Sequence, residues 1–216
     1  MQPTVHDAVR PAPQPDPWMA RHELLNQRVL EGNVDLVFIG DSITQGWEGA
    51  GKQVWDKYYE KRNAVNLGIN GDRTQHVIWR LDHGNLSGIR PKLAVVMIGT
   101  NNSICDSSTQ IADGVRTIVN RIKTATPQTT TLILAIFPRG RDASDDRRQI
   151  NEEANRKIAE LADEKQVHYL DIGDEFLAED KTLSPEIMPD LLHLSAEGYR
   201  IWALSIESSL KRFMGD

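Results

Sequence analysis

The sequence of 216 residues predicts one α/β domain built on a parallel sheet with helices on both faces. Two observations lead to this fold class. Five runs of strand length are almost continuously apolar, and the segments between and after them carry apolar residues at every third and fourth position, as amphipathic helices do. Strands that are apolar on both faces are typical of parallel sheets buried between helix layers. We therefore expect a three-layer α/β/α architecture with right-handed crossovers.

The predicted strands and helices alternate along the chain. The strands are expected at residues 34–39 (VDLVFI), 64–67 (AVNL), 93–98 (LAVVMI), 131–137 (TLILAIF) and 167–170 (VHYL). The helical pattern begins near Trp18, and further helices are expected at 54–61, 74–86, 109–124, 145–165 and 196–213. In one of them the apolar face comprises Ile111, Val115, Ile118, Val119 and Ile122.

The first seventeen residues differ from the rest in composition. Five prolines lie between Pro3 and Pro17, and each proline fixes its own φ and removes a backbone donor. We expect residues 1–17 to form an extended arm that lies along a single domain of residues 18–216. The arm lacks the basic segment followed by an apolar segment that marks a secretory signal peptide, and the sequence assigns no compartment.

Composition excludes several classes of partner. The net charge is −6 and no cluster of Lys and Arg forms a stripe, so no nucleic-acid partner is expected. No apolar run approaches the roughly 18 residues that span a bilayer, so no transmembrane segment is expected. The single cysteine, Cys105, rules out an internal disulfide and any multi-cysteine metal site.

Small and polar residues follow the predicted strands. In open parallel sheets, ligands bind at the carboxyl ends of the strands. The residues found there are Gly40-Asp41-Ser42-Ile43 after the first strand, Gly68-Ile69-Asn70-Gly71-Asp72 after the second, and Gly99-Thr100-Asn101-Asn102 after the third. Residues 173–194 show little regular pattern and contain Asp190 and His193, and loops of this length are usually functional or disordered.

These loops supply the groups that acyl transfer needs. Ser42 is the candidate nucleophile, and His193 is the candidate base, with Asp190 beside it to hold the tautomer of the imidazole. Two structural interpretations stay open from these residues alone. Ser42 is also typical of a helix cap or turn, and His193 of a residue that caps the helix starting at Ser195.

Three groups are candidate donors to the oxyanion that forms when a hydroxyl attacks a carbonyl. They are the backbone N–H groups of Ser42 and Gly71 and the side-chain amide of Asn101. Gly71 suits this position because a Cβ would obstruct close approach, although a turn with positive φ explains the glycine equally well. Asn101 is likewise compatible with a left-handed turn. The remaining histidines are expected to be structural or at the surface: His6, His22, His76, His83 and His168.

Two other functions use the same loops. A non-catalytic module could bind a sugar or nucleotide there, but it has no need of the pair formed by Asp190 and His193. A metallohydrolase could use Asp41, Asp72, Asp190 and His193, but only one histidine is present in these loops. These residues therefore favour acyl transfer over either of the two alternatives, which both stay open at this point.

Taken together, these blocks resemble those of the SGNH (GDSL-type) hydrolases. The four blocks occur in the family's order: Gly40-Asp41-Ser42-Ile43, Gly71 in NLGINGD, Asn101 in IGTNN, and Asp190-Leu191-Leu192-His193. The segments VNLGINGDRTQHVIWRL, RPKLAVVMIGTNN, AIFPRG and DLLHLSAEGY are similar to the branch that holds the catalytic subunits of intracellular platelet-activating-factor acetylhydrolase and related microbial acetylesterases. The similarity runs from about residue 18 to about residue 213.

The resemblance implies a flavodoxin-like sheet of order 2-1-3-4-5, a triad of Ser42, His193 and Asp190, and an oxyanion hole of Ser42, Gly71 and Asn101. It implies no metal or cofactor. Ile43 stands where the family often has leucine, which changes little. Thr44 stands where the Gly-x-Ser-x-Gly elbow of α/β-hydrolases has its second glycine, so that fold is not indicated.

The resemblance also implies a small acyl pocket. In the acetylesterase branch, the positions of Ile43, Thr100 and Leu192 line this pocket, and their bulk leaves room for an acetyl group and little more. The implied partner is a small-molecule ester, either an acetylated sugar or a lipid. A homodimer remains open at this stage.

Overall fold

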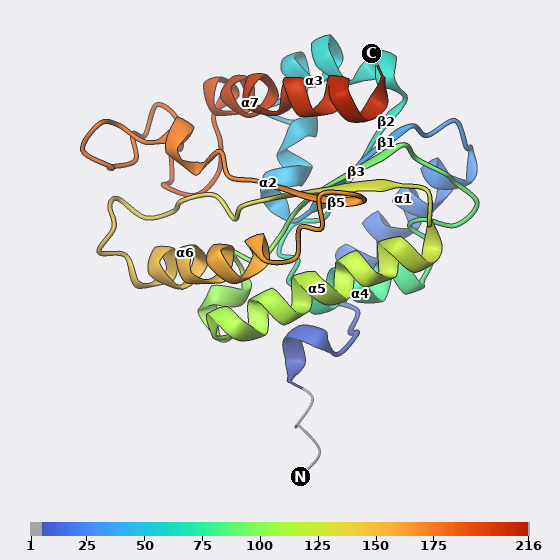
Figure 1. Cartoon of the computed structure of the whole chain (residues 1–216), viewed down its shortest axis with the longest axis horizontal. Coiled ribbons are helices and arrows are strands. Elements are labelled where there is room, and N and C mark those ends of the chain that lie inside the picture. Colours follow the sequence, from blue (N-terminus) through green and yellow to red (C-terminus); the bar gives the residue numbers. More distant parts are fainter. Residues whose placement is uncertain (1–5, 216) are drawn as a thin grey trace.

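The computed structural model describes residues 6–215, and these form a three-layer α/β/α domain (Figure 1). The central sheet has five parallel strands in the order β2-β1-β3-β4-β5, so the expected fold class and strand order are confirmed. The strands are β1 Leu36–Gly40, β2 Ala64–Gly68, β3 Leu93–Met97, β4 Thr130–Leu134 and β5 Val167–Leu170.

Seven α-helices and several short 3₁₀ turns are described around the sheet. The helices are α1 Trp18–Leu30, α2 Ser42–Gln45, α3 Lys52–Tyr58, α4 Thr74–Asp82, α5 Ser108–Ala125, α6 Asp146–Ala159 and α7 Ala196–Met214. The 3₁₀ turns are η1 Asp7–Val9, η2 Gly46–Glu48, η3 Glu60–Arg62, η4 Asn102–Ile104 and η5 Gly173–Phe176. In Figure 1, α3 and α7 lie on one side of the sheet, and α4, α5 and α6 lie on the other.

Each face of the sheet buries its own apolar cluster, because successive side chains of a strand point to opposite faces. In β1, Val37 and Ile39 pack with α1, α4, α5 and α6, while Leu36 and Phe38 pack with α2 and α7. All five residues of β1 are buried. This two-sided burial explains why the strands read as continuous apolar runs.

Several predicted boundaries differ from the observed ones by a few residues, and side-chain hydrogen bonds explain the two largest shifts that concern α6 and β4. The expected helix at 145–165 ends at Ala159, because the Asp163 carboxylate accepts the backbone N–H groups of the next turn and directs the chain into β5. The strand expected to reach residue 137 ends at Leu134. Both backbone polar groups of Ile136 bond instead to the side chain of Asn155 on α6, at 2.8 and 2.9 Å.

The described part of the N-terminal arm lies against the domain. Its η1 turn carries the fully buried Ala8, whose carbonyl oxygen accepts the Thr74 hydroxyl at 2.8 Å. The N–H of Ala12 donates to the carbonyl of Gln75 at 3.3 Å. The arm therefore contacts the start of α4, which directly follows β2 and its loop. The first five residues of the predicted arm lie outside the described residues.

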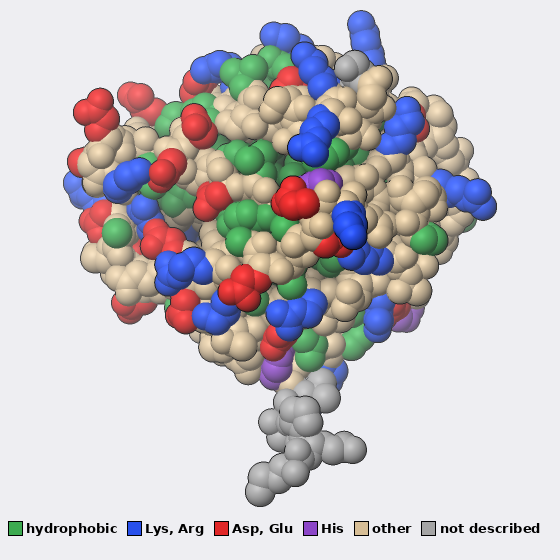
Figure 2. Space-filling model, viewed as in Figure 1, with side chains coloured by type: hydrophobic (Ala, Val, Ile, Leu, Met, Phe, Trp, Pro, Cys, Tyr) green, Lys and Arg blue, Asp and Glu red, His purple; other side chains and the backbone are tan. Residues whose placement is uncertain are grey.

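The surface is mixed in charge. On the face drawn in Figure 2, acidic and basic side chains are interspersed, with apolar side chains between them near the middle. None of the described helices is both long enough and apolar enough to span a bilayer.

Candidate active site

Ser42 is the first residue of α2 and follows β1 after one intervening residue, Asp41. The Asp41 side chain caps this short helix by accepting the N–H of Ile43 at 3.0 Å, so the interpretation of Ser42 as the cap was wrong. Gly40 permits the tight turn, because a Cβ there would collide with the Thr44 side chain and a carbonyl of β3. The Ser42 hydroxyl is therefore not needed to cap α2.

The Ser42 hydroxyl forms a chain of hydrogen bonds with two residues of the loop before α7. Its Oγ lies 2.8 Å from Nε2 of His193, and Nδ1 of His193 lies 2.6 Å from Oδ2 of Asp190. Ser42 and His193 are 151 positions apart in the sequence. The capping residue of α7 is Ser195, whose Oγ accepts the N–H of Gly198, so His193 is not the cap.

Asp190 organises its own loop as well as the imidazole. Its Oδ1 accepts the backbone N–H groups of Leu192 and His193 at 3.1 and 2.7 Å. Burial acts to raise the pKa of Asp190, but the hydrogen bonds from His193 and the backbone outweigh it and hold the pKa below its usual value. The carboxylate is therefore charged where the imidazole needs an acceptor.

Leu191 holds a backbone conformation that a leucine rarely adopts, with φ of 60°. Such a conformation costs about 1–3 kcal/mol and persists only where its surroundings impose it. Here the Leu191 N–H donates to Met188, and the Leu191 carbonyl accepts the N–H of Gly140. The first bond lies within the loop of the histidine, and the second attaches this loop to the loop after β4.

Gly71 lies in the loop after β2 and has φ of +76°. A Cβ at this position would meet no atom within 4 Å, so the observed reason for glycine is backbone conformation and not crowding by the protein. Gly71 is also exposed. Its N–H therefore belongs to a loop with open space beside it.

Asn101 connects the loop after β3 to the loop of Gly71. Its Nδ2 donates to the backbone carbonyl of Asp72 at 2.9 Å. Its φ of −75° excludes the left-handed turn that the sequence left open. An amide nitrogen carries two hydrogens, so one remains for a ligand.

The three residues expected to line an acyl pocket differ in burial. Ile43 and Thr100 are each 1% exposed, while Leu192 is half-buried. Thr100 is held from two sides: Arg139 donates to its carbonyl and hydroxyl oxygens at 3.2 and 3.1 Å, and Asn151 donates to the hydroxyl at 3.3 Å.

Asp41, next to Ser42, is unusual for a carboxyl group in its burial and in its pKa. It is fully buried, and within residues 6–215 its Oδ2 has no hydrogen-bond partner. Burial raises the pKa of Asp41 to about 7, with the charge of Asp72 acting in the same direction and that of His193 against it. Asp41 is therefore largely a neutral carboxyl group below pH 7.

The carboxylates considered as metal ligands have separate partners. Asp72 accepts from Trp18 and Arg80, while Asp190 accepts from His193. Among the described residues, no three His, Cys, Asp or Glu side chains converge as a metal site would require.

Four residues near the site were not singled out from the sequence: Arg139, Asn151, Trp18 and Arg80. Arg139 belongs to the segment AIFPRG, which contributed to the family resemblance without a role for the arginine. Asn151, Trp18 and Arg80 lie on helices. The helical pattern of apolar residues does not show which loops these side chains contact. Burial of Arg80, which is 0% exposed, is a property that composition does not reveal.

The chain is similar to one known family and to several named proteins. Residues 38–201 match the GDSL-like lipase/acylhydrolase family. The chain is 36% identical over 200 residues to the human platelet-activating factor acetylhydrolase IB subunit alpha1, a match that covers 91% of this chain and 84% of the relative. It is 35% identical to the rat alpha2 subunit over 185 residues, or 85% and 79% of the two chains.

Solved structures show the same fold at lower identity. A GDSL-like lipase from Bacteroides thetaiotaomicron superposes with a TM-score of 0.71 at 19% identity, covering 89% of this chain and 97% of the other. An acetylxylan esterase from Geobacillus stearothermophilus superposes with a TM-score of 0.66 at 20% identity, covering 86% and 95%.

Proposed function

Because the chain belongs to the GDSL-like lipase/acylhydrolase family and is thus an ester hydrolase, we propose that it cleaves short-chain acyl esters, acetyl esters first among them. Ser42 is the nucleophile, His193 the general base, and Asp190 the residue that orients the histidine. The hydrogen bond of 2.8 Å between Ser42 Oγ and His193 Nε2 carries this proposal.

The reaction proceeds in two steps. His193 takes the hydroxyl proton at Nε2 while Ser42 Oγ attacks the ester carbonyl. The hydrogen bond from Nδ1 to Asp190 supports this tautomer, which leaves Nε2 free to accept. The imidazolium returns its proton to the leaving alcohol, and water then releases the acyl group by the same route.

The negative charge of the tetrahedral intermediate requires donors that are already in place. The backbone N–H groups of Ser42 and Gly71 and the second hydrogen of the Asn101 amide fill this role. The open space beside Gly71 and the tie from Asn101 to the same loop support the assignment.

The acyl preference rests on the buried residues beside the nucleophile. Ile43 and Thr100 are almost fully buried, and Thr100 is held by Arg139 and Asn151, so this wall has little freedom to move. A rigid wall rejects a longer chain more strongly than a soft one. The human relative, 36% identical, is named as an acetylhydrolase. The leaving alcohol is either a sugar or a lipid.

A non-catalytic binding module is a poorer account of the site. Such a module would have no use for an imidazole held between a hydroxyl and a carboxylate. The hydrogen bonds of His193 to both Ser42 and Asp190 favour catalysis.

Replacement of Ser42 by alanine tests the proposal. Hydrolysis of p-nitrophenyl acetate by Ser42→Ala should fall by at least about 10³-fold in kcat, with the thermal melt unchanged. The exposed Ser87 provides a matched control, and Ser87→Ala should keep wild-type activity. An organophosphate should label Ser42 in the wild type. Retention of more than a few per cent of activity in Ser42→Ala would overturn the nucleophile assignment.

A further inference from the structure

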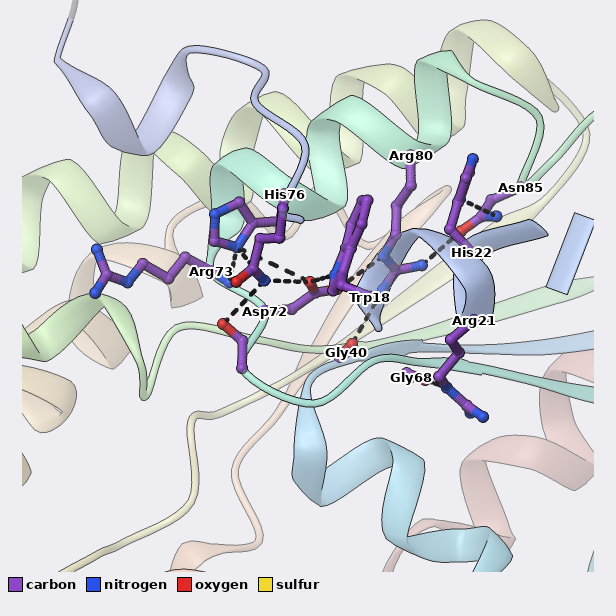
Figure 3. A network of polar contacts seen from close by, with 12 residues as sticks. Trp18, Arg21, His22, Gly40, Gly68, Asp72, Arg73, His76, Arg80 and Asn85 are labelled. Atoms are coloured by element: carbon purple, nitrogen blue, oxygen red, sulfur yellow. Dashed lines mark hydrogen bonds and ion pairs between the residues drawn. The ribbon is translucent and has the colours of Figure 1, made fainter. Parts of the chain in front are cut away.

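The loop that connects β2 to α4 contains Gly71 and Asp72 and is attached to its surroundings at both ends (Figure 3). At its start, Nε of Arg21 donates to the carbonyl of Gly68 at 2.9 Å. At its end, Nε1 of Trp18 donates to Oδ1 of Asp72 at 2.6 Å. Both donors lie on the first turn of α1, so one rigid helix holds the two ends of the loop.

A second helix holds the same loop from another direction. Arg80 of α4 is completely buried, and its Nε donates to Oδ2 of Asp72 at 2.8 Å. Its Nη2 donates to the carbonyl of Gly40 at 3.0 Å, and Gly40 is the last residue of β1, two positions before Ser42. One guanidinium group therefore joins the loop of Gly71 to the strand that carries the serine.

A third connection joins this loop to Asn101, the side-chain donor of the proposed oxyanion hole. The carbonyl of Asp72 accepts the side-chain amide of Asn101, whereas its carboxylate is occupied by Trp18 and Arg80. A rotation of Asp72 would therefore move the acceptor that orients Asn101. It would also move the peptide bond that joins Asp72 to Gly71.

We infer that Trp18, Arg21 and Arg80 are positioning residues that set the geometry of the oxyanion hole through the loop from Gly68 to Asp72. None of these three side chains is assigned a contact with the substrate. The inference rests on the proposed roles of Gly71 and Asn101. Misplacement of a catalytic group by about 1 Å costs as much as 10²-fold in rate, so small displacements of this loop are sufficient.

A loss of activity caused by positioning has to be distinguished from one caused by lower folding stability. Arg80 and Asp72 form a buried ion pair, and removal of one partner from such a pair is strongly destabilising. In variants of Arg80 or Asp72, a fall in kcat could not be separated from a loss of folding stability. Trp18 and Arg21 can be changed with the ion pair left intact.

Trp18→Phe keeps an aromatic ring among its neighbours His22 and Trp79, and it removes the donor to Asp72 together with part of the indole ring system. We expect kcat for p-nitrophenyl acetate to fall about tenfold with KM within twofold, less than the about 10²–10³-fold loss from removing an oxyanion donor outright. Trp202→Phe is the matched control, because Trp202 is buried and its Nε1 has no hydrogen-bond partner among the described residues. This control should melt lower and keep kcat.

Arg21→Met supplies an independent variant at a partly exposed side chain. It removes the bond to Gly68 and also the ion pair with Glu48. Glu48→Gln removes the charge of the partner alone and serves as its control. We expect kcat to fall several-fold in Arg21→Met, with KM little changed, and to remain at the wild-type value in Glu48→Gln.

A double-mutant cycle with Asn101→Ala gives the decisive measurement. If Trp18 acts through the oxyanion hole, Trp18→Phe should reduce kcat by much less in the Asn101→Ala background than in the wild type. Equal reductions in both backgrounds, or an unchanged kcat in either single variant, would overturn the inference. If Trp18→Phe does not fold, the Arg21→Met cycle decides. Ser42→Ala tested in parallel separates failure of this inference from failure of the proposed function.

Discussion

The side-chain amide of Asn101 donates to the backbone carbonyl of Asp72 over 2.9 Å. This bond joins the loop after β3 to the loop after β2 across the carboxyl edge of the sheet, where neighbouring loops approach the end of β1. Because Asp72 follows Gly71 directly, the bond relates two of the three proposed oxyanion donors to each other. Asn101 is therefore the position at which the proposed oxyanion hole can be tested by itself.

Asn101→Ala should lower kcat for p-nitrophenyl acetate by about 10²–10³-fold, because a donor to the transition-state oxyanion is lost. KM should change little, since the donor contributes less to the ground state. Steady-state kinetics measure both constants. Asn120→Ala, at an exposed site on α5, is the control and should match the wild type. A large rise in KM with an unchanged kcat would assign Asn101 to substrate binding instead.

Asp190→Asn should lower kcat by about 10²–10⁴-fold, because the amide loses the charge that stabilises the imidazolium of His193. The loop should keep its shape, since an asparagine oxygen can still accept from the backbone as Asp190 does now. Asp180 forms a similar turn with Thr182 and, within residues 6–215, has no hydrogen bond or ion pair with a histidine, so Asp180→Asn is a matched control. Equal activities of the two variants would remove Asp190 from the triad.

The acyl series should fall in kcat/KM in the order p-nitrophenyl acetate, butyrate and octanoate. A methylene that clashes with a rigid wall is rejected more strongly than the about 1–3 kcal/mol typical of a loose pocket. Leu192→Ala should flatten the series by opening space beside His193. Leu204→Ala, at a half-exposed position on α7, should leave the series unchanged. Octanoate as the best substrate of the wild type would contradict the preference for acetyl groups.

Asp41→Asn should change how stability depends on pH. The unfolded residue ionises near its usual pKa of 3.8, whereas burial raises the pKa of the folded residue to about 7. The folded state therefore holds a proton between these values that the unfolded state has lost. The contribution of Asp41 to the free energy of unfolding is fully present below about pH 3.8 and is lost as pH rises from there to about 7, by as much as about 4 kcal/mol.

Asparagine removes this titration and keeps the oxygen that caps Ile43. Chemical denaturation of both proteins between pH 4 and 8 should show the wild type losing stability relative to Asp41→Asn as pH rises. The comparison must allow for the other charged or titratable groups that interact with Asp41: Asp72, His193, Arg80, Arg139 and Tyr199. Parallel stability profiles would show that Asp41 ionises normally.

Local pattern was sufficient to predict the elements of the sheet. The apolar runs at the five strands and the helical period between them follow from burial on both sheet faces, which each segment records in its own residues. Boundaries were less predictable. Asp163 and Asn155 end their neighbouring elements through side-chain hydrogen bonds that are set by the surrounding fold.

The candidate site residues were found in sequence as the polar ends of strands, because parallel strands bring their carboxyl ends to one edge. The order of four short blocks then indicated the family. The sequence pattern did not decide the structural role of each of these residues. Asp41, not Ser42, caps α2, and a positive φ explains Gly71.

By itself, the sequence determined the layers of the fold, the family and the residues that form the candidate triad, because each of these is recorded in local composition or in contiguous motifs. Only the tertiary structure decided that Ser42 and His193, 151 positions apart, lie within 2.8 Å of each other. It also decided that Trp18 and Arg80 hold Asp72 from two helices. Such contacts depend on how separate helices, strands and loops pack together. The residues that share this packing energy are far apart in the sequence, so no local pattern of residues reveals them.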